Sequence, residues 1–129
     1  MKGIREDGSP IKVMAVDDSP ISRKMIKKAL EPDGFLICGE AGNGKEAVEL
    51  YPQVQADVIT MDVTMPIMDG LDAAAIIKKI NPGQRIIMLS AMGDDDIIND
   101  AKSRGINDIC PKPFKAADLI AKILKVMEE

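Results

Sequence analysis

The stretch "VITMDVTMP", residues 58–66, indicates a buried strand that ends on an acid. Its first four residues are apolar or β-branched, the run stops at Asp62, and Pro66 follows four residues later. Such an uninterrupted run is typical of a strand that is buried on both faces of a parallel sheet. An acid at the end of a single strand usually has no role beyond contact with water. Whether Asp62 has a function therefore depends on what the other strands carry at the same edge.

Apolar runs of the same kind recur along the chain, with segments of helical spacing between them. The runs cover residues 11–16, 36–38, 57–61, 85–89 and 106–110. We expect helices from Pro20 to Pro32, from Asn43 to Pro52, from about Leu71 to Asn81, from about Asp94 to Gly105, and over residues 119–127. This alternation predicts the α/β class, with a doubly wound sheet of five parallel strands and helices on both faces.

Two of these helices have apolar residues that we expect to face the sheet. In the first helix they are Ile21, Met25, Ala29 and Leu30, and in the third they are Ile76, Ile77 and Ile80. Their spacing of three and four residues places them on one side of each helix.

The composition indicates one globular domain and excludes several classes of function. The chain has 129 residues and a formal net charge of -4, so no basic field is present to attract nucleic acid. It contains no histidine, which excludes Ser-His-Asp and Cys-His catalysis and histidine-ligated metals within this chain. The two cysteines, Cys38 and Cys110, lie in apolar runs, so we expect them to be buried side chains and not metal ligands.

The amino-terminal segment differs in character from the rest of the chain. Residues 1–10 are mostly polar, and we expect them to be a flexible lead-in to a single domain of residues 11–129. They lack the apolar centre of a secretion signal, and no apolar run approaches the length of a membrane span. We therefore expect a cytoplasmic protein that does not interact with a membrane.

The carboxyl ends of the expected strands carry the residues that indicate a function. The first strand ends on Asp17 and Asp18, the third on Asp62, the fourth on Ser90, and the fifth is followed by Lys112. Ligands bind at this edge of an open parallel sheet, so these side chains are expected to converge. Two carboxylates about 4 Å apart repel by about 4 kcal/mol at an effective dielectric constant of about 20. A divalent cation removes that repulsion, and a site of oxygen ligands favours Mg²⁺, with Mn²⁺ as the alternative.

One further motif suggests a nucleotide site but does not complete it. The stretch "GEAGNGK", residues 39–45, has the glycine and lysine spacing of a P-loop. The next residue is Glu46, where a P-loop requires serine or threonine to bind Mg²⁺ and where a carboxylate repels phosphate. We interpret the glycines as a turn between a strand and a helix.

Four motifs together resemble a known family. The motifs "VDDSP", "VITMDVTMPIMDG", "LSAMG" and "PKPF" are similar to those of the receiver domain of bacterial two-component response regulators. The resemblance covers residues 11–127 and keeps the motifs in the family's order and separations. It implies a flavodoxin-like fold with the strand order 2-1-3-4-5. Thr64 and "SAMG" resemble the stand-alone chemotaxis regulators of the CheY type.

The resemblance implies a role for each acid at the strand ends. Asp62 would be the phosphoacceptor, which takes a phosphoryl group from a phosphohistidine of a partner histidine kinase. Asp18, Asp62 and the backbone carbonyl of Thr64 would hold Mg²⁺, and Asp17 would act on the ion largely through water.

The resemblance also implies a switch. Lys112 would pair with Asp62 and then with the phosphoryl group, and its peptide bond to Pro113 would be cis. The hydroxyl of Ser90 would move to the phosphoryl group, and Met92 lies where family members tune hydrolysis of the aspartyl phosphate. The family usually has tyrosine or phenylalanine three residues before the lysine, and this chain has Ile109 there. We therefore expect weaker coupling between phosphorylation and the binding surface.

Several functions are compatible with these residues. The first is a stand-alone phosphorylation switch in chemotaxis, with a flagellar motor switch protein as its target and a phosphatase as a possible further partner. The alternatives are a phosphorelay intermediate and a receiver domain excised from a larger regulator. A Mg²⁺-dependent phosphatase with an aspartate nucleophile is more remote, because Thr64 stands where such enzymes carry a second aspartate. We expect no enzymatic activity beyond the chain's own phosphorylation and dephosphorylation.

Overall fold

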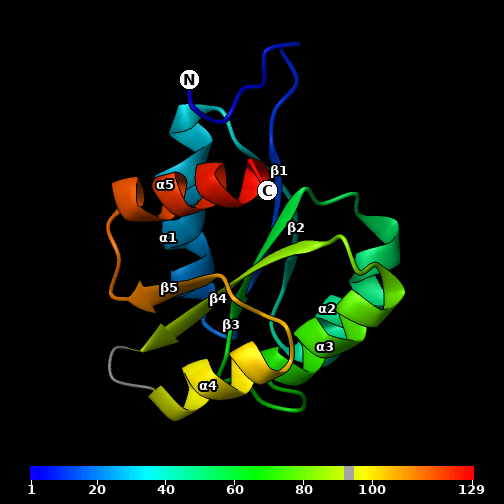
Figure 1. The fold of residues 1–129 in the computed structure, drawn as a ribbon. Coiled ribbons are helices and arrows are strands. Elements are labelled where there is room, and N and C mark those ends of the chain that lie inside the picture. The colour runs from blue at the N-terminus through cyan, green and yellow to red at the C-terminus, as the bar shows by residue number, and fades with distance from the viewer. Residues whose placement is uncertain (92–94) are drawn as a thin grey trace.

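Five parallel strands form one sheet with helices on both faces (Figure 1). The computed structural model of the chain describes residues 1–91 and 95–129. The elements in chain order are β1 (Lys12–Val16), α1 (Pro20–Leu30), β2 (Leu36–Ala41), α2 (Gly44–Leu50), β3 (Val58–Asp62), α3 (Gly70–Ile80), β4 (Arg85–Ala91), α4 (Asp95–Ser103), β5 (Ile109–Lys112) and α5 (Ala116–Met127). The strand order is β2-β1-β3-β4-β5, which confirms the predicted α/β class and topology. Met92 and the helix start expected at Asp94 lie outside the described residues.

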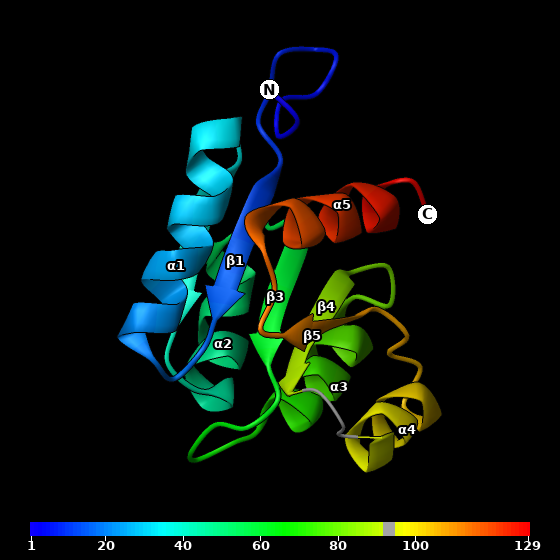
Figure 2. The ribbon, with the colours of Figure 1, turned by 90° about the vertical axis from the view of Figure 1, so that its left-hand side faces the viewer.

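Each face of the sheet has its own layer of helices and its own hydrophobic cluster. Helices α1 and α5 cover one face, and α2 and α3 cover the other (Figures 1 and 2). On the first face Ile26 packs in one cluster with Leu119, and on the second Ile77 packs with Met61 and Met88. Methionine and branched aliphatic side chains fill a core that has few aromatic residues.

Strand β3 lies at the centre of this arrangement, between β1 and β4. Val58 belongs to the cluster under α1 and α5, whereas Ile59 belongs to the cluster under α2 and α3. All residues of β3 before Asp62 are buried, so Asp62 is the point at which the strand leaves the core. The strand therefore holds this carboxylate on a rigid support.

The fifth strand lies further along the chain than predicted. It covers Ile109–Lys112, whereas we expected residues 106–110. Ile106 instead completes the end of α4, because its N–H donates to the carbonyl of Ala101 at 2.9 Å after Gly105 has turned to a φ of 81°. An apolar residue after a left-handed glycine commonly packs back onto its own helix. As a result Lys112 is the last residue of β5 and not a residue beyond it.

Two other strands end later than predicted, at Ala41 for β2 and at Ala91 for β4. Strand β3 ends on Asp62, as the sequence predicted. In β2 and β4 the additional residues continue parallel pairing with a neighbouring strand, which polar and small residues do as well as apolar ones.

The predicted buried faces of two helices were partly wrong. Ile21 and Met25 of α1 are 73% and 63% exposed, because the face of α1 that meets the sheet is formed by Ile26 and Leu30. Ile80 is 56% exposed, because it is the last residue of α3. Apolar spacing alone does not distinguish these neighbouring faces of a helix.

The amino-terminal segment contacts the end of the sheet opposite the strand ends that carry the acids (Figure 2). The N–H of Gly3 donates to the carbonyl of Asp33 at 2.8 Å, and the N–H of Ile11 donates to the carbonyl of Gly3 at 2.7 Å. The guanidinium group of Arg5 lies 2.6 Å from the carboxylate of Asp57. These contacts join residues 1–10 to the domain, and the expected flexibility of the segment stays a prediction.

The helices are short. The longest of those in residues 1–91 and 95–129 is α5, with 12 residues, whereas a membrane span requires about 20. None of the helices in these ranges combines the length and the hydropathy that crossing a bilayer requires.

Gly70, the first residue of α3, leaves no room for a side chain. A β-carbon at this position would lie 2.0 Å from the carbonyl oxygen of Asp62 and 2.9 Å from Cγ of Met61. Gly70→Ala is therefore expected to separate α3 from β3 and to lower the free energy of unfolding by about 1–3 kcal/mol. Gly83→Ala is the control, because the nearest atom to its new β-carbon would be Oδ1 of Asn81 at 3.5 Å. Urea unfolding measures both variants, and equal losses in the two would contradict the prediction.

Candidate functional site

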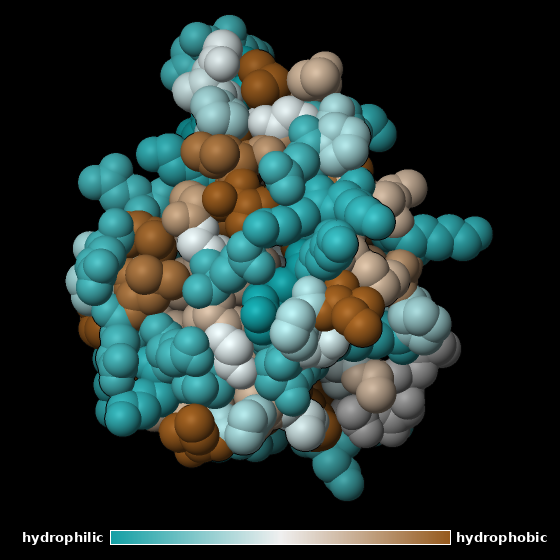
Figure 3. Space-filling model, turned by 180° about the vertical axis from the view of Figure 1, so that it is seen from behind, coloured by the Kyte–Doolittle hydropathy of each residue, from teal (hydrophilic) through white to brown (hydrophobic). Residues whose placement is uncertain are grey.

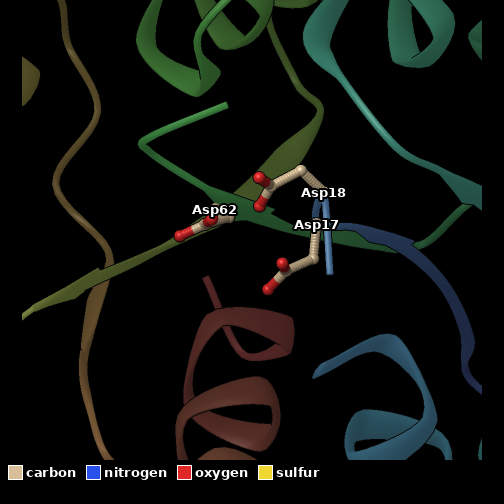
Figure 4. Close-up of side chains that lie close together, drawn as sticks. All are labelled: Asp17, Asp18 and Asp62. Carbon is tan, nitrogen blue, oxygen red and sulfur yellow. The ribbon is translucent and has the colours of Figure 1, made fainter. Parts of the chain in front are cut away.

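Three aspartates meet beyond the carboxyl ends of β1 and β3. Asp17 and Asp18 follow β1 directly, and Asp62 ends β3, which pairs with β1 so that Val16 lies opposite Met61. Each aspartate contributes one carboxylate oxygen to a group whose members all lie within 4.8 Å of one another. Figure 4 shows the three side chains around this common point. The structure thus brings together the carboxylates that the sequence predicted to converge.

Lys112 approaches the same group from β5. Its Nζ lies 3.1 Å from Oδ2 of Asp17 and 3.1 Å from Oδ1 of Asp62, so one ammonium group donates hydrogen bonds to both carboxylates. The peptide bond between Lys112 and Pro113 is cis, which confirms the prediction. The three strand ends are therefore joined by charge-assisted hydrogen bonds, which are stronger than neutral ones.

The turn between β1 and α1 fixes the most buried of the acids. Asp17 is 1% exposed, and its Oδ1 accepts a hydrogen bond from the N–H of Ser19 at 3.0 Å. Ser19 also caps α1, where its hydroxyl accepts from the N–H of Ser22 at 3.2 Å and Pro20 occupies the first helical position. Arg23 donates to the backbone carbonyl of Asp17 at 2.6 Å. These local bonds explain how an acid is held in a buried position.

Burial and charge act in opposite directions on Asp62. Burial raises the pKa of Asp62, the hydrogen bond and charge of Lys112 lower it, and the negative charges of Asp17 and Asp18 raise it again. The net result is a pKa above the usual range. Without a metal ion, Lys112 therefore does not fully offset the cost of burying the negative charge of Asp62 beside two other carboxylates.

Lys112 has the opposite balance. Burial alone would lower the pKa of Lys112, but the hydrogen bonds and charges of Asp62 and Asp17 outweigh it and raise the pKa. The site thus favours the neutral form of Asp62, because the pKa of this acid is raised, but the charged form of Lys112, because the pKa of this base is raised as well. The lysine faces only opposite charges, whereas the aspartate also faces two like charges, so both directions follow from one geometry.

An apolar cavity of about 300 Å³ lies beside the charged groups, between α1 and the segment after β5. It is lined by Asp17, Ser22, Met25, Ile26, Leu89, Lys112, Pro113 and Phe114. Most of these side chains are apolar, which explains why Lys112 is partly desolvated while its ammonium group contacts the carboxylates.

Among the hydrogen bonds and ion pairs of the described residues, none joins Ser90, Thr64 or Ile109 to the carboxylates of the site. Ser90 is buried in β4, one residue beyond the position that pairs with Asp62, and its hydroxyl has one long hydrogen bond of 3.4 Å to the carbonyl of Ala91. Thr64 is exposed in the loop between β3 and α3. Ile109 is half-buried and packs against the cluster under α2 and α3. The structure does not join Ile109 to the acidic group.

The loop between β3 and α3 is fixed by two glycines whose role the sequence interpretation missed. The N–H of Gly44 donates to the carbonyl of Met68 at 2.9 Å, and a β-carbon on Gly44 would lie 2.5 Å from that oxygen. Gly70 donates to the carbonyl of Val63 at 2.8 Å. Glycine at both positions was the only available signal, and the contacts themselves depend on the tertiary fold.

The P-loop-like stretch forms a strand and a helix cap, as the sequence interpretation expected. Residues up to Ala41 belong to β2, and the side chain of Asn43 caps α2 by accepting from the N–H of Glu46 at 2.9 Å. The side-chain amide of Asn43 in turn donates a hydrogen bond to the carboxylate of Glu46 at 3.0 Å. Gly42 lies in the turn between β2 and α2, whereas Gly39 lies within β2 and Gly44 is the first residue of α2.

Known proteins resemble the chain over nearly its whole length. Residues 13–124 match the family described as the response regulator receiver domain. The chemotaxis protein CheY of Thermotoga maritima is 41% identical over 115 residues, which are 89% of this chain and 96% of that protein. The chemotaxis protein CheY of Bacillus subtilis is 43% identical over 116 residues, which are 90% and 97% of the two chains.

A solved structure shows the same similarity in three dimensions. One chain of the crystal structure of the CheX-CheY-BeF3-Mg²⁺ complex from Borrelia burgdorferi has a TM-score of 0.88 and 33% sequence identity to this chain. The match covers 97% of this chain and 96% of that chain. The chain belongs to the response regulator receiver domain family. Within that family its similarity is to the CheY type.

Asp62→Asn is expected to stabilise the fold when no divalent cation is present. Asparagine keeps an acceptor for Lys112 and removes a carboxylate whose pKa is raised above the ordinary value of 3.8. A raised carboxyl pKa means that the folded state binds the proton more tightly, so this contribution to stability falls as the pH rises from about 3.8 through the folded pKa. Urea unfolding with EDTA should therefore show the variant more stable than wild type at neutral pH. The advantage should shrink at about pH 3, and an advantage that is constant with pH would contradict this cause.

Proposed function

We propose that the chain is a phosphorylation switch in which Asp62 accepts a phosphoryl group from the phosphohistidine of a partner histidine kinase. The convergence of three carboxylates and the Lys112 ammonium group at one edge of the sheet carries this proposal. The side chain of Asp62 is 13% exposed, so a donor can reach it, whereas Asp17 is closed off from solvent. Membership of the receiver domain family supports the same role.

The chemistry requires positioning and charge neutralisation more than a strong base. A carboxylate oxygen of Asp62 forms a bond to phosphorus while the bond from phosphorus to the imidazole nitrogen of the partner breaks. The bonding electrons stay on that nitrogen, which takes up a proton. Lys112 orients the attacking carboxylate and offsets the charge of the phosphoryl group, and the weakly held hydroxyl of Ser90 is free to turn toward it.

The donor set fits a magnesium ion. All the available ligands are oxygens, and three carboxylates lie within 4.8 Å of one another. Asp18, Asp62 and the carbonyl of Thr64 would hold Mg²⁺, Asp17 would act largely through water, and Mn²⁺ would fit the same residues. When bound, the ion would supply positive charge to the carboxylates and to the phosphoryl oxygens.

The output of the switch is proposed to be protein binding in chemotaxis, with a flagellar motor switch protein as the target. The CheY proteins of two bacteria support this role, and the Borrelia burgdorferi structure shows that a CheY protein forms a complex with another protein. The binding face would comprise α4, β5 and α5, of which β5 pairs with β4 so that Pro111 lies opposite Ser90. The chain would catalyse only its own phosphorylation and dephosphorylation, in the cytoplasm.

Phosphorylation by a small donor tests the central proposal. Incubation with acetyl phosphate and Mg²⁺ should add one phosphoryl group to the wild-type chain, measured by intact mass. Asp62→Asn should add none, because it lacks the carboxylate oxygen that forms the bond to phosphorus. Asp69→Asn is the control, because Asp69 is exposed and its side chain caps α3. Labelling that persists in Asp62→Asn would assign the phosphoacceptor to another residue.

Magnesium should stabilise the folded chain by relieving carboxylate repulsion. A ligand of the native state present at 100 times its dissociation constant adds about 2.7 kcal/mol. The melting temperature of the wild-type chain should therefore rise with Mg²⁺, and the rise should disappear in Asp18→Ala. Glu6→Ala, which removes an exposed acid at the opposite end of the sheet, should keep it. Equal shifts in wild type and Asp18→Ala would place the ion elsewhere.

Binding to the motor protein should depend on phosphorylation. Titration of an amino-terminal peptide of a flagellar motor switch protein, followed by NMR because the chain has no tryptophan, measures the affinity. Beryllofluoride with Mg²⁺ should raise that affinity, and a modest rise would fit the absence of an aromatic residue at Ile109. Unchanged affinity, or no binding in either state, would exclude this target.

A further inference from the structure

The loop between β3 and α3 holds an isoleucine in an unfavourable position. Ile67 has a φ of 71°, and the N–H of Met68 donates to the carbonyl of Pro66 at 2.7 Å, which closes a three-residue turn around it. Among the described residues it is the non-glycine residue with a positive φ. A β-branched side chain is strained in this left-handed region, which glycine and asparagine adopt more readily.

The side chain of Ile67 does not pack in the hydrophobic core. It is 79% exposed, so the chain accepts both a strained backbone and an apolar group in water at one residue. A glycine or an asparagine would remove both penalties. The packing of this chain therefore does not account for an isoleucine at this position.

The surrounding contacts fix Ile67 relative to the site. Met68 is held by the N–H of Gly44 at 2.9 Å, and Gly70 by the carbonyl of Val63 at 2.8 Å. Gly70 also abuts the carbonyl of Asp62, where a β-carbon would lie 2.0 Å away. These contacts hold both ends of the segment around Ile67, which lies in the loop that follows Asp62 at this edge of the sheet.

A second element presents apolar groups at the same end of the molecule. Helix α1 begins beside Asp18 and carries Ile21 and Met25 exposed, with exposed Lys24 and Lys28 in the same stripe. Figures 1 and 2 show the start of α1 and the β3–α3 loop at one end of the fold. On the face in Figure 3, apolar side chains form small patches separated by hydrophilic ones.

We propose that Ile67 is an apolar anchor for the protein that donates the phosphoryl group, and that it contacts a surface next to the donor's phosphohistidine. The inference rests on the proposed function, because it assumes that a protein brings the phosphoryl group to Asp62. The side chain of Asp62 is 13% exposed, and the β3–α3 loop follows it directly in the chain, so a macromolecular donor that reaches Asp62 comes close to this loop. The lysines of α1 favour a donor surface that is apolar near its histidine and acidic beyond it. A small donor such as acetyl phosphate has no surface to anchor.

The test compares a protein donor with a small one. The protein donor is the ³²P-labelled phosphohistidine domain of a chemotaxis histidine kinase, and the small donor is acetyl phosphate, both with Mg²⁺. Ile67→Asn is expected to lower kcat/KM for the protein donor by about tenfold or more, as for a central interface residue. Labelling by acetyl phosphate should stay at the wild-type rate. The urea unfolding midpoint should be unchanged or higher, because asparagine fits the left-handed turn.

Two control variants separate the anchor from other effects. Ile67→Val keeps an apolar β-branched side chain and should transfer at nearly the wild-type rate. Ile80→Asn removes another exposed isoleucine at the far end of α3 and should not slow transfer.

The outcomes distinguish the inference from the proposal on which it rests. Equal transfer rates in wild type and Ile67→Asn would overturn the anchor alone. Slower labelling of Ile67→Asn by acetyl phosphate would also overturn it, because the loop would then act on Asp62 directly. A wild-type chain that acetyl phosphate labels but no kinase domain does would overturn it as well. Absence of labelling of the wild-type chain by acetyl phosphate would instead refute the proposed function.

Discussion

Mutual repulsion of three carboxylates is the constraint on which the edge of the sheet depends. Asp17, Asp18 and Asp62 each place an oxygen within 4.8 Å of the others, and Lys112 supplies one positive charge to two of them. Burial is the main cause that raises the pKa of Asp62, and the negative charges of Asp17 and Asp18 add to it. Most folds avoid such an arrangement. Here a bound cation, or the loss of the negative charge of Asp62, would relieve the repulsion.

The backbone around Asp62 is held more firmly than the side chains that would respond to it. Gly70 packs against the carbonyl of Asp62, and Gly44 holds the following loop, so the backbone on the α3 side has little room to move. Ser90 on the β4 side has only a 3.4 Å hydrogen bond to hold its hydroxyl. When the charge at Asp62 changes, the Ser90 side chain of β4 is therefore able to move more readily than the backbone next to α3. This asymmetry fits a signal that is transmitted along one side of the sheet.

Much of the fold and of the acidic site could be predicted, because both follow from short-range patterns. Buried strands appear as continuous apolar runs, and a parallel sheet necessarily brings their carboxyl ends together. The prediction failed for β5 because Ile106 extends an apolar run but packs as the end of α4. It failed for Ile21 and Met25 because apolar spacing does not tell which neighbouring face of a helix is buried.

The features around the site were less predictable, because they depend on contacts between distant segments. Nothing local to Gly44 shows that its amide meets the carbonyl of Met68, or that a side chain on Gly70 would collide with Asp62. The positive φ of Ile67 contradicts the preference of its own residue type, so a local pattern argues against it.

The bonds from Lys112 connect residues that are 95 and 50 positions apart in the chain. Contacts of such long sequence separation form late, since much of the chain must be ordered before they become favourable. During synthesis the acids of β1 and β3 leave the ribosome well before the lysine that offsets their charge. The ion pairs of Lys112 with Asp17 and Asp62 therefore exist only after β5 has joined the sheet. A partner that recognises this edge by its charge would distinguish completed copies from nascent or truncated ones.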